Sequence, residues 1–284
     1  VQPHGRMTLS WSAELPVQQS GLELSHFELE SELCHMLSSG TLHLFSPHEY
    51  DLAVQSFEVT DSGIRLIANQ MIPDAGGSIT VSREGMIHFS GDVAGDLVKT
   101  IPDKIDGRMW FNNATWHTPI LSAPLVALDG EVRLTSATMF VRHLKARFLD
   151  IPMELGGRIV FRPIERGVES IDLDWNAGGE LDNVRRLIRH VSAGGEESFE
   201  LDGTFDAQGR FKLNDPFAGS LSDALERTAS QGWINILDGR VRSTGSDLVL
   251  DDVRGRIDLT DGQIHTKDPI TGLIHGEDIE SVSY

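Results

Sequence analysis

Short stretches in which apolar and polar residues alternate recur along the whole chain, and a glycine begins each of them. The clearest copies are GTLHL (40–44), GMIHF (85–89), GRMWF (107–111), GEVRL (130–134), GRIVF (157–161), GRFKL (209–213), GWINI (232–236) and GRIDL (255–259). A period of two is typical of strands that bury one face, and glycine is a common turn residue. The pattern therefore predicts a mainly β protein with a glycine turn before each strand.

The glycines of these stretches are evenly spaced. Gly209, Gly232 and Gly255 lie 23 residues apart, which indicates a repeated supersecondary unit. Such a unit is either one antiparallel hairpin or one coil of a parallel β-helix. Asp-Gly turns favour the hairpin, because parallel neighbours need long crossovers. We expect a long antiparallel curved sheet, either an open groove or a β-taco meander, with two or three short helices.

Two stretches carry the signal of a tight hairpin. WINILDGRVRS (233–243) and RIDLTDGQIHT (256–266) both place Asp-Gly between alternating residues, which suits a type I′ turn. With such a turn, Ile236 faces Val241 and Leu259 faces Ile264 across the two strands.

Helices are predicted where the alternation breaks. Residues 180–191 place apolar side chains on one helical face and run into Gly194-Gly195. Residues 220–230 offer Ser220 as an N-cap. The stretch 31–40 is a third candidate for a short helical turn.

The chain shows no linker, so we expect a single elongated β-domain over 1–284, with the strongest repeat character over 200–276. It starts at Val1, and no run approaches the roughly 20 apolar residues of a membrane helix. Both a complete chain and a fragment of a longer chain therefore stay open.

The alternation also predicts which side chains share one face of the sheet. An open sheet of amphipathic strands needs a second sheet, helices or an apolar ligand to cover that face. Both a dry core and a groove for acyl chains satisfy this need. The arginines between the apolar positions, at 108, 133, 158 and 256, should face water. The predicted apolar face consists of Met109, Phe111, Val132, Leu134, Ile159, Phe161, Ile234, Ile236, Val241, Ile257, Leu259 and Ile264.

The net charge and the absence of known catalytic motifs exclude several classes of function. The formal net charge of −19 disfavours nucleic acid as a partner, and the single cysteine, Cys34, excludes an intrachain disulfide. No nucleophile elbow, P-loop or zinc-binding helix motif appears, so we expect neither an enzyme nor a bound metal or cofactor. The rival is a β-helix enzyme acting on polysaccharide. Asp172 and Asp174 alternate as in a calcium loop, but they also fit the outward positions of a strand.

The C-terminal third resembles a known family. GWINILDGRVRSTGSDLVLDDVRGRIDLTDGQIHTKDPITGLIHG (232–276) is similar to the repeats of AsmA-like proteins of the TamB/YdbH type, and 76–162 is similar more loosely. The resemblance implies a periplasmic β-groove that carries phospholipid between membranes. It also implies a cell-envelope location with envelope proteins as partners, and inner-membrane anchoring through a segment not present in this chain.

A second, weaker resemblance gives an alternative. GRMTLSWSAELP (5–16) and LGGRIVF (155–161) are similar to phrases of the N component of type II secretion systems. This resemblance implies a periplasmic structural subunit of a secretion system, without lipid cargo.

Overall fold

The computed structural model describes most of the chain as β-strands. The described residues are 7–14, 21–32, 34–44, 48–59, 78–99, 102–117, 123–162, 167–191, 199–214, 229–243, 248–260, 263–266 and 270–275. The strands are β1 (Thr8–Glu14), β2 (Leu22–Glu30), β3 (Cys34–Leu42), β4 (Glu49–Val59), β5 (Ser78–Asp96), β6 (Lys104–His117), β7 (Leu125–Thr135), β8 (Thr138–Phe148), β9 (Ile151–Arg162), β10 (Gly167–Glu180), β11 (Phe199–Asp202), β12 (Thr204–Asn214), β13 (Ala229–Ser243), β14 (Val249–Thr260), β15 (Gln263–His265) and β16 (Thr271–His275).

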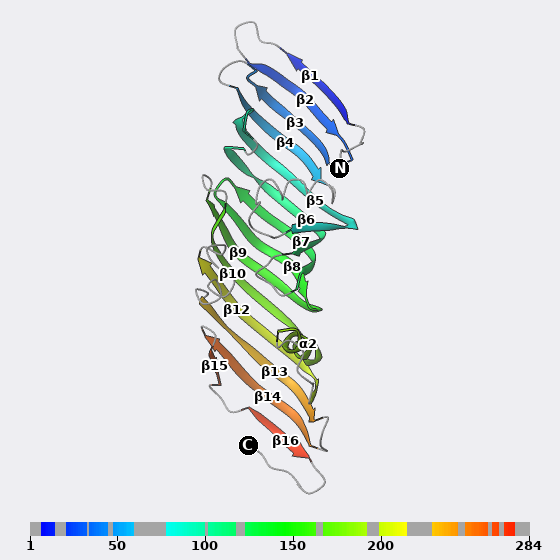
Figure 1. Cartoon of the computed structure of the whole chain (residues 1–284), viewed down its shortest axis with the longest axis vertical. Coiled ribbons are helices and arrows are strands. Elements are labelled where there is room, and N and C mark those ends of the chain that lie inside the picture. The colour runs from blue at the N-terminus through cyan, green and yellow to red at the C-terminus, as the bar shows by residue number, and fades with distance from the viewer. Residues whose placement is uncertain are drawn as a thin grey trace.

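All of these strands belong to one 16-stranded sheet, and every neighbouring pair is antiparallel. The strands follow one another in chain order from β1 to β10 and then through β12, β13, β14 and β15. Figure 1 shows them stacked along the long axis, with β1 at one end and β16 at the other. The sheet is open, since β1 does not pair with the far end. The prediction of a mainly β antiparallel meander is confirmed, and the β-helix alternative is wrong.

A helix of the described residues, α2 (Leu181–Val191), follows β10 directly. It confirms the helix predicted over 180–191. Its first amide donates a hydrogen bond from Leu181 to the carbonyl of Gly203 (2.9 Å), which ties the helix to the connection between β11 and β12. Leu181 is buried and Val184 packs against the same cluster. Most of the predicted helix at 220–230 lies outside the described residues, and its last two positions belong to β13.

The helical turn suggested for 31–40 is wrong. Cys34 to Leu42 form β3, which pairs with β2 on one side and β4 on the other. Hydrogen bonding on both sides outweighs a weak local preference for helix. Ser31 closes the tight connection before the strand, because its hydroxyl oxygen accepts a hydrogen bond from the Cys34 amide at 3.1 Å.

The first predicted Asp-Gly hairpin is also wrong. Asp238 and Gly239 lie inside β13, a single strand of 15 residues, so Ile236 and Val241 are not cross-strand partners. The Asp238 carboxylate instead accepts hydrogen bonds from the backbone amide (2.8 Å) and hydroxyl (2.6 Å) of Thr204. This tertiary contact holds Asp238 beside the junction of β11 and β12, and both of those strands pair with β13.

The second predicted hairpin is confirmed. β14 ends at Thr260, β15 begins at Gln263, and the two strands pair with Leu259 opposite Ile264. The two residues between the strands lie outside the described residues.

The glycines of the alternating stretches were expected in turns, and this expectation is wrong. Gly107, Gly130, Gly157, Gly209, Gly232 and Gly255 all lie inside strands. The spacing of 23 residues therefore corresponds to one long strand plus the connection to the next strand, and not to a two-stranded hairpin. Close approach explains the glycine at some of these positions. At Gly130, φ is 148° and a Cβ atom would lie 2.4 Å from the carbonyl oxygen of His143.

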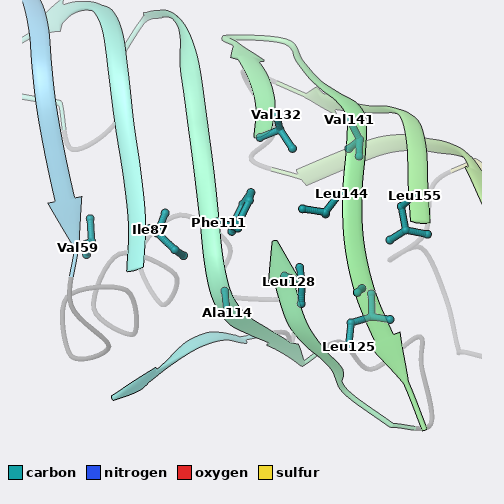
Figure 2. Packing of buried hydrophobic residues seen from close by; sticks show 11 residues of the cluster. Val59, Ile87, Phe111, Ala114, Leu125, Leu128, Val132, Val141, Leu144 and Leu155 are labelled. Atoms are coloured by element: carbon teal, nitrogen blue, oxygen red, sulfur yellow. The ribbon is translucent and has the colours of Figure 1, made fainter. Parts of the chain in front are cut away.

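The largest core cluster lies where the central strands bend. The pairing of β6 with β7 shifts on both sides of Ala114, and Asn113 next to it has a φ of 49°. Such β-bulges bend a strand and increase its twist. Ala114 and Leu128 lie opposite each other at this bend and keep 0% and 2% of their accessible surface. In Figure 2, β6 turns after Ala114, and the side chains of Phe111, Leu128 and Leu144 face a common interior.

Candidate binding surface on the apolar face

Rows of apolar side chains cross the sheet from strand to strand on one face. Residues directly opposite each other on neighbouring strands point to the same side, so the register defines each row. One row spans β1 to β12 and contains Leu9, Leu29, Met36, Phe57, Phe89, Met109, Val132, Val141, Gly157, Leu173 and Phe211. The neighbouring row spans β3 to β14 and contains Cys34, Val59, Ile87, Phe111, Gly130, Leu144, Leu155, Trp175, Gly209, Gly232 and Leu259.

The structure brings most residues of the predicted apolar face into these rows or next to them. Met109 and Val132 are direct partners, and Leu134 lies two residues further along β7. Ile159 pairs with Ile171, and Phe161 with Val168. Further along the sheet, Ile234 pairs with Ile257 and Ile236 with Phe205. Val241 lies beyond two register shifts of β13 and pairs with Leu201, outside these rows.

Burial along this face is uneven. In the centre, Val132 keeps 1% of its accessible surface, and Phe111 and Ile159 are also buried. Towards the C-terminal end, Ile234, Ile236, Ile257 and Leu259 are only half-buried. At the N-terminal end, Trp11 on the edge strand β1 keeps 59%. The centre is therefore filled by its own side chains, whereas the two ends leave apolar surface accessible.

The opposite face is polar. The four arginines expected to face water, Arg108, Arg133, Arg158 and Arg256, are all exposed, which confirms the register. Arg108 and Arg133 are direct cross-strand partners, an arrangement that like charges disfavour. Each has a carboxylate within reach: Arg133 Nη2 lies 3.2 Å from Asp106 Oδ1, and Arg108 Nη1 lies 3.5 Å from Glu131 Oε1.

Asp172 and Asp174, which resemble a calcium loop in sequence, are strand residues of β10 on this polar face. Arg210 binds Asp172 through two hydrogen bonds of 2.7 Å, from Nε to Oδ1 and from Nη2 to Oδ2. These hydrogen bonds hold the pKa of the Asp172 carboxyl below its usual value, against the opposing effect of burial. No group of three or more His, Cys, Asp or Glu side chains within the described ranges is arranged to hold a metal ion.

The glycine-led stretches do not reveal the N-terminal part of the rows. Leu29, Met36 and Phe57 lie outside the glycine-led stretches, for example in SFEV (56–59). The alternation of apolar and polar residues in these strands is the signal that could have found them. A glycine is needed only at particular close contacts, so it does not mark every strand. Leu173 and Trp175 were recognisable as the inward positions of IDLDW (171–175).

No protein-family model, curated protein or solved structure matches this chain. Among the helical residues that the structure describes, no helix is long and apolar enough to cross a membrane.

Proposed function

We propose that the chain binds lipid acyl chains non-covalently along the apolar face and contributes to phospholipid transport between membranes of the cell envelope. The observation that carries the proposal is the continuous apolar face of an open sheet, with half-buried side chains such as Ile257 and Leu259 at its C-terminal end. The resemblance of 232–276 to AsmA-like repeats supports the same function and a periplasmic location. In this proposal the protein is a carrier and catalyses no reaction.

The energetics suit reversible capture. Each CH₂ group of a lipid tail that leaves water contributes about 0.8 kcal/mol, before the cost of ordering the chain. No polar contact is needed for this gain, so we expect weak selectivity between phospholipid head groups. The accessible C-terminal end is the expected contact region, because the centre of the face is already filled by protein side chains.

Two measurements test the proposal. Mass spectrometry of protein purified gently from cells should find co-purifying phospholipid, and a photoreactive amino acid at position 259 should crosslink to it. Leu259→Asp places a charge on the apolar face and should abolish lipid binding. Phe140→Asp is the matched control, because Phe140 is an exposed apolar residue whose cross-strand partners are Arg133 and Arg158 on the polar face. Circular dichroism checks that each variant keeps its sheet.

The alternative is a structural subunit of a secretion system without lipid cargo. The observation that favours it is the closely packed central core around Val132 and Leu128. Lipid-free protein from cells, together with no crosslink from position 259, would support this alternative and contradict the carrier. Equal loss of lipid in Leu259→Asp and Phe140→Asp would also contradict binding at the apolar face.

A further inference from the structure

A depression of about 550 Å³ lies near the C-terminal end of the sheet. Its polar lining includes one cross-strand row from four neighbouring strands: Gln208 on β12 pairs with Trp233 on β13, which pairs with Asp258 on β14, which pairs with His265 on β15. These residues alternate with apolar-face residues such as Ile234 and Leu259, so they belong to the opposite, polar face of the sheet. The depression therefore opens on the polar face, although Leu259 of the apolar face also contributes to its lining.

Asp258 has an incomplete set of hydrogen bonds. The residue lines the depression and keeps only 8% of its accessible surface. Its Oδ1 atom accepts a hydrogen bond from Nε of Arg256 at 3.0 Å, and Nη2 of the same arginine also lies 3.0 Å away. Its Oδ2 atom is shielded from water and has no donor among the described residues. A buried acceptor without a donor is costly.

Asp172 shows what a satisfied carboxylate on the same face looks like. It is equally buried, but Arg210 donates to both of its oxygens. The two aspartates differ in that Asp258 lacks one hydrogen-bond donor, and Asp258 is the one that lines the depression. This points to a ligand that donates a hydrogen bond to Asp258.

Trp233 supplies an aromatic surface beside this carboxylate. The guanidinium carbon of Arg256 lies 5.0 Å from the centroid of the Trp233 ring, a cation–π contact. Arg256 thus connects the indole and Asp258. Its side chain is 43% exposed, so the guanidinium has room to move towards solvent when a ligand approaches these two groups.

The charges around the depression indicate a neutral ligand. Two aspartates, Asp174 and Asp258, and two arginines, Arg210 and Arg256, give a formal charge of zero among these four residues. An ionic ligand would meet a like charge whichever sign it carried. The side chains of Gln208 and Gln231 offer amide donors and acceptors, which suit hydroxyl groups.

We propose that this depression binds a neutral saccharide. A sugar hydroxyl donates to Oδ2 of Asp258, the Trp233 ring packs against an apolar face of the sugar, and the amides of Gln208 and Gln231 bind further hydroxyls. The volume lies within the range of about 300–1,000 Å³ that small-molecule sites occupy.

Titration with three neutral disaccharides, namely maltose, lactose and N,N′-diacetylchitobiose, tests the proposal by tryptophan fluorescence and saturation-transfer NMR. We expect at least one of them to bind with a dissociation constant on the order of 1 mM. Trp233→Phe and Asp258→Asn should each weaken its binding by about tenfold. Trp110→Phe is the matched control and should leave binding unchanged, because Trp110 lies on the same face at β6, beside His88.

Gln208→Ala keeps the test valid if Asp258→Asn does not fold, because Gln208 is exposed and outside the core clusters. It should also weaken binding. Glucosamine and glucuronate, one of each charge, should bind more weakly than uncharged glucose. The proposal is overturned if none of the three disaccharides binds, if the Trp233→Phe and Gln208→Ala variants bind as the unmodified protein does, or if a charged sugar binds more tightly than glucose.

Discussion

Trp175 on β10 lies directly opposite Gly209 on β12, and its indole fills the space that a side chain at position 209 would need. A Cβ atom on Gly209 would come within 2.6 Å of Trp175 Cζ2 and 2.7 Å of the carbonyl oxygen of Gln231. Trp175 also packs against two core clusters, one around Val132 and one around Phe205. The glycine therefore lets one aromatic ring join the central core to the C-terminal part of the apolar face.

Gly209→Ala should lower the free energy of unfolding by about 1–3 kcal/mol, the usual cost of overpacking. Gly156→Ala is the matched control within a strand, because the nearest atom to a Cβ there is the carbonyl oxygen of Arg142 at 3.4 Å. We expect it to be neutral or to stabilise by up to about 1 kcal/mol. Urea denaturation measures both. Equal stability of the two variants would contradict the packing of Trp175 over Gly209.

Local patterns predicted the strands because alternation is a property of neighbouring residues. Ile257 and Leu259 alternate with Arg256 and Asp258, and the structure places the two pairs on opposite faces of β14. The Leu259–Ile264 pairing followed from the two-residue connection alone. For these residues, the local sequence is enough to predict which side chains share a face of the strand.

Contacts between distant residues decided the points that local patterns missed. Asp238-Gly239 and Asp261-Gly262 are the same dipeptide. However, the Asp238 carboxylate accepts hydrogen bonds from Thr204, and β13 continues past it. The glycine at position 209 is explained by Trp175, which is remote in sequence. Whether Oδ2 of Asp258 finds a hydrogen-bond donor likewise depends on the side chains around it. The alternation of apolar and polar residues along β14 cannot predict this.

Leu128 at the central bend offers a direct test of the core. Leu128→Ala should lower the free energy of unfolding by about 2–5 kcal/mol, because it opens a cavity opposite Ala114 where the bend brings side chains together. Phe140→Ala, at an exposed site on the polar face, should change it by no more than about 0.5 kcal/mol. Thermal and urea unfolding measure both. A small effect at Leu128 would contradict a packed core at this bend.

The Asp172–Arg210 pair predicts a pH dependence of stability. Because the hydrogen bonds from Arg210 lower the pKa of Asp172 in the folded protein, the pair stabilises the fold fully above the unfolded pKa, near pH 4. This stabilisation is lost as the pH falls through the lowered pKa. Asp172→Asn should therefore cost about 1.5–3 kcal/mol at neutral pH, and progressively less below about pH 4. A cost that stays constant across this acidic range would contradict the assignment.

Ser38 predicts a stabilising substitution. It lies in β3 between Phe27 and Val54, keeps 1% of its accessible surface, and its hydroxyl has no hydrogen-bond partner among the described residues. Ser38→Ala removes an unsatisfied polar group, so it should raise the free energy of unfolding by about 1 kcal/mol. Urea denaturation measures the change.

Ser136→Ala is the matched control for Ser38→Ala, with the opposite expected sign. The Ser136 hydroxyl oxygen accepts a hydrogen bond of 2.8 Å from the Ile105 amide, which links the connection between β7 and β8 to β6. Its loss should lower the free energy of unfolding by about 1 kcal/mol, because the amide loses its acceptor. Destabilisation by both substitutions would mean that the Ser38 hydroxyl has a partner in solution, because only then does its removal break a bond. Opposite signs would show that the buried Ser38 hydroxyl of β3 makes no hydrogen bond in the fold.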